Sequence, residues 1–170
     1  MSTVHGYKTA HPNFLVSYHS SMKRQLPVFV TLALALAAFG VSYGAAAKKK
    51  VVTPKDFPAG RPFSAGIQVG DTLYVSGSTG TDPKTQKVPD NFEAEVQQCL
   101  DNIGAILKAG GYDFGDAVSV QVYLTDMSMF PRMNAVYTKT FPEPRPTRTT
   151  VGVTALAGGA HIEVTVTARK

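Results

Sequence analysis

One segment of the chain carries apolar residues at helical spacing. Between residues 90 and 109 they recur three or four positions apart and form a single stripe: Phe92, Val96, Leu100, Ile103 and Leu107. Asp90 followed by Glu93 fits an N-terminal capping box, and Gly110-Gly111 is a suitable end. The pattern predicts a helix with one apolar side, which must pack on a sheet.

Other segments alternate between apolar and polar residues, which is the period of a strand with one buried face. In residues 118–124, valine or leucine holds every even position, and in residues 162–168 isoleucine, valine or alanine does so. The turn pair Gly70-Asp71 introduces a further strand over residues 72–78. These segments predict a sheet with one face buried under helices.

The second half of the chain adds two more elements. A second helix is predicted over residues 128–141, with Pro131 in its first turn, where the missing N–H costs little. Residues 147–153 are predicted to be a strand, joined to the last strand by a turn at Gly158-Gly159. The order strand, helix, strand, helix, strand, strand favours an α+β fold, with a mixed sheet and both helices on one face.

The N-terminal part of the chain has the pattern of an export signal. In residues 22–47, Lys23 and Arg24 precede an apolar run, and small residues end it at Ala47. We therefore expect a signal peptide cleaved near Ala47, a periplasmic or secreted protein, and no stable membrane anchor after cleavage. The alternative is a protein anchored in the membrane by an uncleaved signal, because the run approaches the length that spans a bilayer.

The chain of 170 residues suits one domain with attachments. We interpret residues 1–21 as an extension ahead of a misassigned start, because Met22 is a better start for an exported protein. Residues 48–58 are interpreted as a linker, and residues 59–170 as the folded domain.

Charge and composition narrow the possible chemistry. Residues 1–47 hold three Lys or Arg and no carboxylate, whereas the rest holds fourteen Lys or Arg and twelve Asp or Glu. Little basic surplus is left to neutralise phosphates, so we expect no nucleic acid partner. Cys99 is the only cysteine and His161 the only histidine after residue 47, so we expect no metal. The sequence also has no phosphate-binding loop, so we expect no organic cofactor. We interpret Cys99 as a core residue.

Four segments, in this order and spacing, resemble the reactive intermediate deaminase (Rid, or YjgF) family. They are RPFSAGIQVGDTLYVSG, VSVQVYLTDMSMFPRMNAVY, PTRTTVGV and HIEVTVTA. The resemblance implies a chorismate-mutase-like fold and homotrimers with clefts between subunits. It also implies hydrolysis of reactive enamines and imines, such as 2-aminoacrylate and 2-iminopropanoate, to 2-oxo acids and ammonia.

Arg148 and Glu163 are the candidate catalytic residues. Arg148 begins a strand after a proline-rich segment, and its planar fork suits a bidentate grip on a carboxylate. The resemblance assigns it the substrate carboxylate, whereas Arg145 lies outside the matched motif. Glu163 lies on the polar face of the last strand, and is either a solvated residue or, as the resemblance implies, a carboxylate that positions or activates water.

The resemblance also implies four cleft residues that bind substrate: Phe63, Ser76, Gly77 and Asn134. Gly77 would let a backbone group approach the ligand closely. Asn134 is equally compatible with a helix surface. Phe63 stands where the family has tyrosine, and Thr150 stands where it often has cysteine. Phe63 therefore keeps apolar contact with a substrate but lacks the phenol.

Two other functions remain open. One is a noncatalytic small-carboxylate-binding or chaperone-like envelope protein of the same fold, which export and the missing phenol favour. The other is the ribonuclease or translation-inhibitor role sometimes assigned to relatives, which fits poorly with export and with the charge distribution.

Overall fold

The computed structural model describes residues 46–170. The proposed extension and all but the end of the proposed signal peptide lie outside the described residues, so export stays a prediction. Within the described part, no helix is long and apolar enough to cross a membrane.

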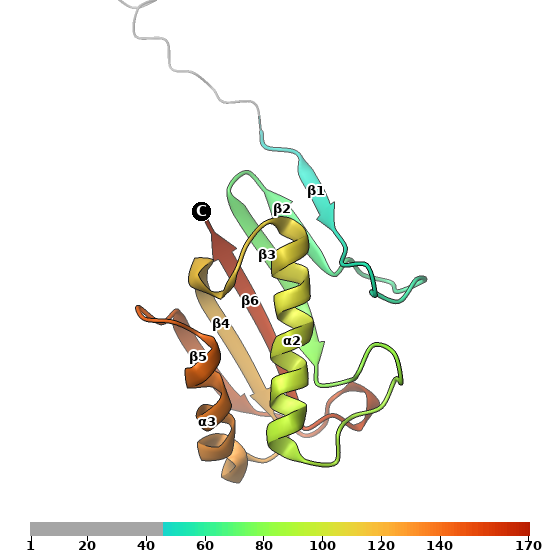
Figure 1. The fold of residues 1–170 in the computed structure, drawn as a ribbon, viewed down its shortest axis with the longest axis vertical. Coiled ribbons are helices and arrows are strands. Elements are labelled where there is room, and N and C mark those ends of the chain that lie inside the picture. The colour runs from blue at the N-terminus through green and yellow to red at the C-terminus, as the bar shows by residue number, and fades with distance from the viewer. Residues whose placement is uncertain (1–45) are drawn as a thin grey trace, which may run out of the picture. The chain divides into compact units, whose positions relative to one another are not determined.

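A single sheet of six strands forms the centre of this part, in the order β1-β2-β3-β6-β4-β5 (Figure 1). The strands are β1 (Lys49–Val52), β2 (Gly66–Val69), β3 (Thr72–Thr79), β4 (Ala117–Leu124), β5 (Thr147–Gly152) and β6 (Ile162–Arg169). Only β4 and β5 pair in parallel, and the other pairs are antiparallel. The predicted mixed sheet is confirmed.

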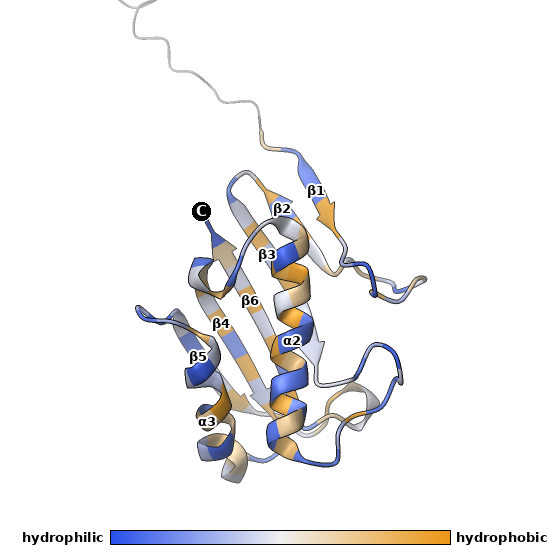
Figure 2. Cartoon of the chain, in the orientation of Figure 1, coloured by the Kyte–Doolittle hydropathy of each residue, from blue (hydrophilic) through white to orange (hydrophobic). Residues whose placement is uncertain are grey.

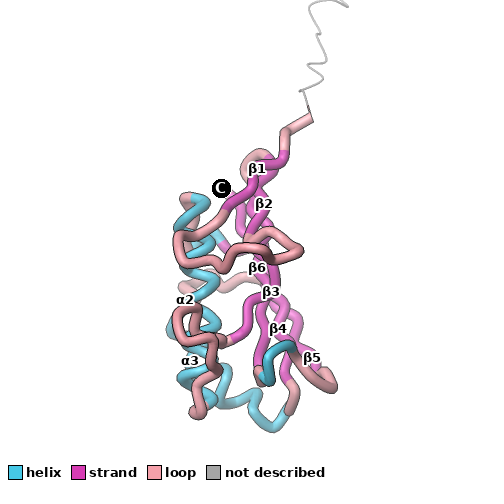
Figure 3. The backbone as a smooth tube through the Cα atoms, turned by 90° about the vertical axis from the view of Figure 1, so that its right-hand side faces the viewer, coloured by secondary structure: helices cyan, strands magenta, loops and turns pink. Residues whose placement is uncertain are grey.

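Two helices, α2 (Phe92–Gly110) and α3 (Phe130–Thr140), cover one face of this sheet, as Figure 3 shows edge-on. The apolar side of α2 packs over β3 and β6. Figure 2 shows the alternation of apolar and polar residues along the strands that makes this possible. The largest fully buried side chains come from both layers: Leu73, Leu100, Ile103, Leu107, Leu124, Met133, Phe141 and Ile162.

The N-terminal cap of α2 differs from the prediction. Asn91, not Asp90, caps the helix, because its side chain oxygen accepts a hydrogen bond from the Ala94 amide at 2.9 Å. Glu93 closes no capping box and instead pairs with Arg132 of α3, with Oε2 2.6 Å from Nη2. The hydrogen bonds from Arg132 lower the pKa of Glu93 to about 2. The helix ends as predicted, at a left-handed Gly111.

The structure departs from the predicted strands at the edges of the sheet. Residues 49–52, expected in the linker, form β1, and β2 was not predicted. Both strands have four residues, and in β1 only Val52 is buried, so neither carries a long alternating pattern.

Val118 of β4 does not join the buried face. The pairing of β4 with β6 shifts between Ala117 and Ser119, which leaves Val118 45% exposed.

The predicted second helix begins later than expected. A short 3-10 turn, η2 (Met127–Met129), precedes α3, and Asp126 accepts a hydrogen bond from the Ser128 amide to start it. The last two strands do not pair with each other, because β4 lies between β5 and β6. The segment with Gly158 and Gly159 therefore carries the chain across β4 rather than closing a hairpin.

Candidate active site

Four of the six predicted site residues lie together in one open pocket of about 990 Å³: Phe63, Ser76, Gly77 and Glu163. Strand pairing between β2 and β3 ends at Val75, so the last residues of β3 have no strand partner on the side of β2. The Ser76 hydroxyl donates a hydrogen bond to the Ser64 carbonyl at 2.7 Å, and the Ser76 amide donates to the Ala65 carbonyl at 2.9 Å. These bonds hold the Phe63 segment against β3 and so define one wall of the pocket.

The Glu163 side chain lies directly over Gly77. The pairing of β3 with β6 shifts between Val75 and Ser78, and a Cβ atom added at Gly77 would overlap the Glu163 carboxylate. Among the described residues, no hydrogen bond or ion pair occupies the Glu163 oxygens. A carboxylate in this state can accept a proton from a bound water molecule or a substrate.

Gly77→Ala should therefore weaken any activity that depends on Glu163. The added methyl group would push the carboxylate out of place, and we expect a loss of roughly 10-fold to 100-fold in kcat/KM. Steady-state kinetics with circular dichroism would test this. Gly104→Ala is the matched control, because its added methyl group meets Phe114 at 3.2 Å, away from the pocket. Unchanged activity in Gly77→Ala would show that the position of Glu163 is unimportant.

Arg148 is held by aromatic rings. Its guanidinium carbon lies 4.5 Å from the ring centre of Tyr137 and 5.4 Å from that of Phe130, both on α3. In the described part of the chain no carboxylate pairs with Arg148, whereas Arg145 is bonded to Glu143. The stacked guanidinium is therefore fixed in orientation while its N–H groups remain available for an anion.

A second, shallower pocket of about 470 Å³ contains Arg148 together with Asn134 and Tyr137. The Tyr137 hydroxyl is buried without a hydrogen-bond partner among the described residues, and so is the Thr150 hydroxyl. Burial raises the pKa of Tyr137, and the nearby Arg148 partly opposes this rise. The phenol is therefore neutral near pH 7 and has an unused donor.

Within one chain the two pockets share no residue. Arg148 pairs across the sheet with the buried Val120, on the face that the helices cover. Glu163 pairs with Tyr123, which points to the opposite face. The structure therefore brings together four predicted residues in one pocket and two in the other, and it does not bring Arg148 to Glu163.

Comparison with known proteins gives the family of the chain. The family model described as Endoribonuclease L-PSP matches residues 53–170. The chain belongs to the Rid (YjgF) family. A RutC family protein of Saccharolobus solfataricus is 46% identical over 110 residues, which is 64% of this chain and 87% of that protein.

Two further Rid proteins are similar to this chain. The mouse 2-iminobutanoate/2-iminopropanoate deaminase is 39% identical over 118 residues, which is 68% of this chain and 87% of the mouse protein. The crystal structure of RidA from an Antarctic Psychrobacter is 34% identical, with a TM-score of 0.68, over 71% of this chain and 98% of that one. The predicted Rid fold is thus confirmed.

Sequence reasoning missed two residues that shape the Rid pockets. Tyr137 lies three residues after Asn134 on the same helix face, so helical spacing would have placed it beside that predicted site residue. Phe57 lines the large pocket, but it lies in the segment interpreted as a linker and no pattern indicated it.

Cys99 is in the core as predicted. Its Sγ lies 3.0 Å from the Ser78 carbonyl, and burial raises the pKa of this thiol far above its ordinary value.

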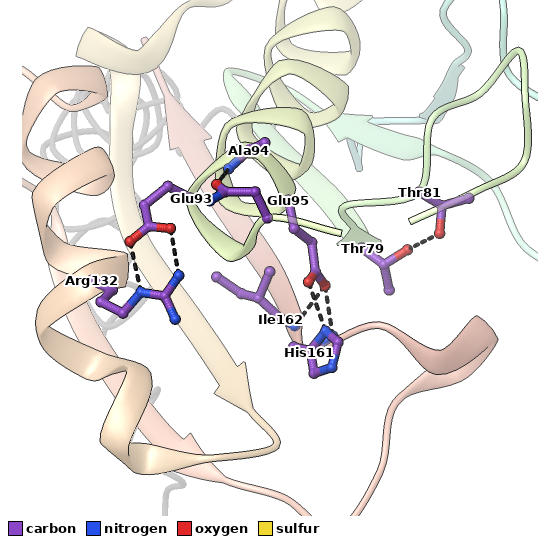
Figure 4. Close-up of polar contacts among 9 residues, drawn as sticks. Thr79, Thr81, Glu93, Ala94, Glu95, Arg132, His161 and Ile162 are labelled. Carbon is purple, nitrogen blue, oxygen red and sulfur yellow. Dashed lines mark hydrogen bonds and ion pairs between the residues drawn. The ribbon is translucent and has the colours of Figure 1, made fainter. Parts of the chain in front are cut away.

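A buried carboxylate was also missed. Glu95 of α2 is fully buried and accepts hydrogen bonds from the backbone amides of His161 at 2.6 Å and Ile162 at 3.2 Å (Figure 4). Its second oxygen lies 2.8 Å from Nδ1 of His161. Glu95 follows Phe92 by three residues and so lies on the buried side of the helix. This spacing could have predicted that Glu95 is buried. Glu95 thereby fixes the start of β6 at Ile162, which directly precedes Glu163 in the pocket.

Proposed function

We propose that this Rid protein hydrolyses reactive 2-imino acids, and the enamines that tautomerise to them, to 2-oxo acids and ammonia. The observation that carries the proposal is that two charged side chains have no partner of opposite charge among the described residues. They are the Glu163 carboxylate over Gly77 and the Arg148 guanidinium stacked on Tyr137. The activity named for the mouse relative supports the same reaction class.

The proposed mechanism uses water as the nucleophile. Arg148 binds the substrate carboxylate and so orients the protonated C=N group, whose carbon is already electrophilic. Glu163 accepts a proton as water adds to that carbon, which gives a carbinolamine. Glu163 then returns the proton to nitrogen, and the C–N bond breaks as the carbinolamine hydroxyl loses its proton and becomes the C=O group of the 2-oxo acid. Ammonia takes up that proton and leaves as ammonium. Each turnover consumes one water molecule and no oxidant or reductant.

We propose that the working site lies between two copies of the chain in a homotrimer. Arg148 and Glu163 face opposite sides of one sheet, so a neighbouring copy must bring the arginine to the pocket of Glu163. The sheet face that the helices leave uncovered supports this arrangement. It exposes 52% of Tyr74 and carries the Thr165 hydroxyl, bonded to Gln121 at 3.2 Å. A mostly antiparallel sheet can leave such a face in water, and the same face is available to pack against neighbouring copies of the chain.

Thr165→Arg should separate the trimer, because it places a charged side chain in the middle of that uncovered face. We expect sedimentation velocity to give a trimer for the wild type and a monomer without deaminase activity for the variant. Lys139→Glu changes an exposed residue near the end of α3 that lines neither pocket, and it should leave the trimer intact. A wild-type monomer at micromolar concentration would contradict the shared site.

The proposed reaction can be tested directly on 2-iminopropanoate. An amino-acid oxidase generates this imine from alanine, and semicarbazide traps what remains. We expect the imine to disappear faster in the presence of the protein, with equal yields of pyruvate and ammonia. Heat-denatured protein is the control, and equal rates with both samples would refute the deaminase.

A noncatalytic carboxylate-binding protein is the second candidate, and Phe63 favours it because this ring carries no phenol to place water. It predicts binding of pyruvate without any acceleration of imine loss. Phe63→Tyr separates the two candidates, since a binding module stays inactive while an enzyme limited by the missing phenol gains rate.

A further inference from the structure

The large pocket exceeds what a small imino acid needs. At about 30 Å³ for each non-hydrogen atom, the volume of a water molecule in the liquid, 2-iminopropanoate fills less than about 180 Å³. The pocket around Glu163 measures about 990 Å³. On the same scale, the seven side-chain atoms of an arginine from a neighbouring subunit would take about 210 Å³ of this space in the proposed trimer, which leaves far more than a methyl side chain fills.

One wall of this pocket is aromatic. The rings of Phe57 and Phe63 meet edge to face, with centroids 6.1 Å apart and planes at 74°. Phe57 is half-buried and packs against the core, while Phe63 keeps 49% of its surface exposed. Such a pair offers one fixed ring and one accessible ring to a ligand.

Aliphatic groups of α2 continue the aromatic wall. Ile106, Ala105 and Ala109 line the same pocket on successive turns of the helix. The groups assigned to the chemistry, Gly77 and Glu163, come from β3 and β6. The pocket therefore has an apolar wall, built by Phe57, Phe63 and the apolar residues of the last turns of α2. Its polar groups come from the strands and from α2 itself, which also contributes Gln98, Asp101, Asn102 and Lys108.

We infer that the site is built for 2-imino acids with a bulky apolar side chain, and that Phe57 and Phe63 are its specificity-determining residues. This inference rests on the proposed function. With the carboxylate bound by arginine and the imine carbon beside Glu163, the third substituent of that carbon is the side chain. An aromatic or branched aliphatic side chain buries its apolar surface against the wall, whereas a methyl group leaves most of the wall exposed to water.

The inference is tested with the wild-type protein and four imines made by amino-acid oxidases, derived from alanine, leucine, phenylalanine and glutamate. We expect kcat/KM for the phenylalanine and leucine imines to exceed that for the alanine imine by roughly 10-fold. The glutamate imine probes Arg61, an exposed cation at the same pocket. A preference for the alanine or the glutamate imine would overturn the inference, even though the deaminase would stand.

Phe57→Ala should lower kcat/KM roughly 10-fold for the phenylalanine imine and by less than about 2-fold for the alanine imine. Phe63→Ala should act in the same direction, and it serves if Phe57→Ala does not fold. Val51→Ala is the matched control, because Val51 is 59% exposed on β1 and lies outside the pocket. Equal losses for both imines in the two Phe variants would overturn the role of these residues.

Absence of activity on all four imines would refute the deaminase, and binding would then decide the inference. Calorimetry would measure the binding of phenylpyruvate and pyruvate, whose side chains contact the same apolar wall without any reaction. Tighter binding of phenylpyruvate that Phe57→Ala removes would sustain the specificity. Equal binding of the two acids would overturn it.

Discussion

Arg148→Ala should reduce kcat/KM for a 2-imino acid by roughly 30-fold to 1000-fold, which corresponds to about 2–4 kcal/mol for a charge-assisted bidentate contact. The side chain is stacked on Tyr137 and Phe130 and has no carboxylate partner among the described residues, so its orientation does not depend on substrate. Arg148→Lys keeps the charge but loses the planar fork, and it should fall between the wild type and the alanine variant.

Arg145→Ala is the matched control for this prediction. Arg145 lines the same shallow pocket, but Glu143 already occupies its guanidinium. We expect its loss to cost far less activity. Circular dichroism and sedimentation would check the fold and the oligomeric state in all three variants. Equal activity in the wild type and Arg148→Ala would exclude Arg148 from the site.

Glu95→Ala should lower the free energy of unfolding by about 2–4 kcal/mol, because it leaves the amides of His161 and Ile162 without an acceptor in a buried place. Denaturant titration followed by circular dichroism measures the change. Glu93→Ala is the neighbouring control. Its carboxylate pairs with Arg132 at the surface, where solvent screens the interaction, so the change should be much smaller. Similar losses in the two variants would contradict the structural role of Glu95.

The elements of the fold could be predicted where periodicity is long and uninterrupted. The stripe on α2 and the alternation along β6 each have one explanation, and both are confirmed. The prediction was wrong where a single hydrogen bond or a local shift decides the outcome. Asn91 rather than Asp90 caps α2 because its side chain reaches the Ala94 amide, and Val118 is exposed because the pairing of β4 shifts.

The candidate site could be predicted residue by residue but not as an arrangement. Phe63, Ser76, Gly77 and Glu163, which the motifs singled out, lie around one pocket. Alternation along β6 could place Glu163 on the uncovered face, but no sequence pattern shows that Arg148 lies on the other face. That follows from the pairing of β5 with β4, which is a long-range contact. The role of Phe57 depends on a loop whose conformation no periodicity encodes.

The central claim is that Arg148 of one subunit works with Glu163 of another, and mixed trimers test it most directly. Arg148→Ala and Glu163→Ala subunits, each nearly inactive alone, are unfolded together and refolded, or co-expressed with two tags. Every mixed trimer then has one cleft with both residues intact. Random mixing should restore about one quarter of the wild-type sites, and hence about one quarter of the wild-type activity. Activity no higher than the mean of the two separate variants would contradict a site shared between subunits.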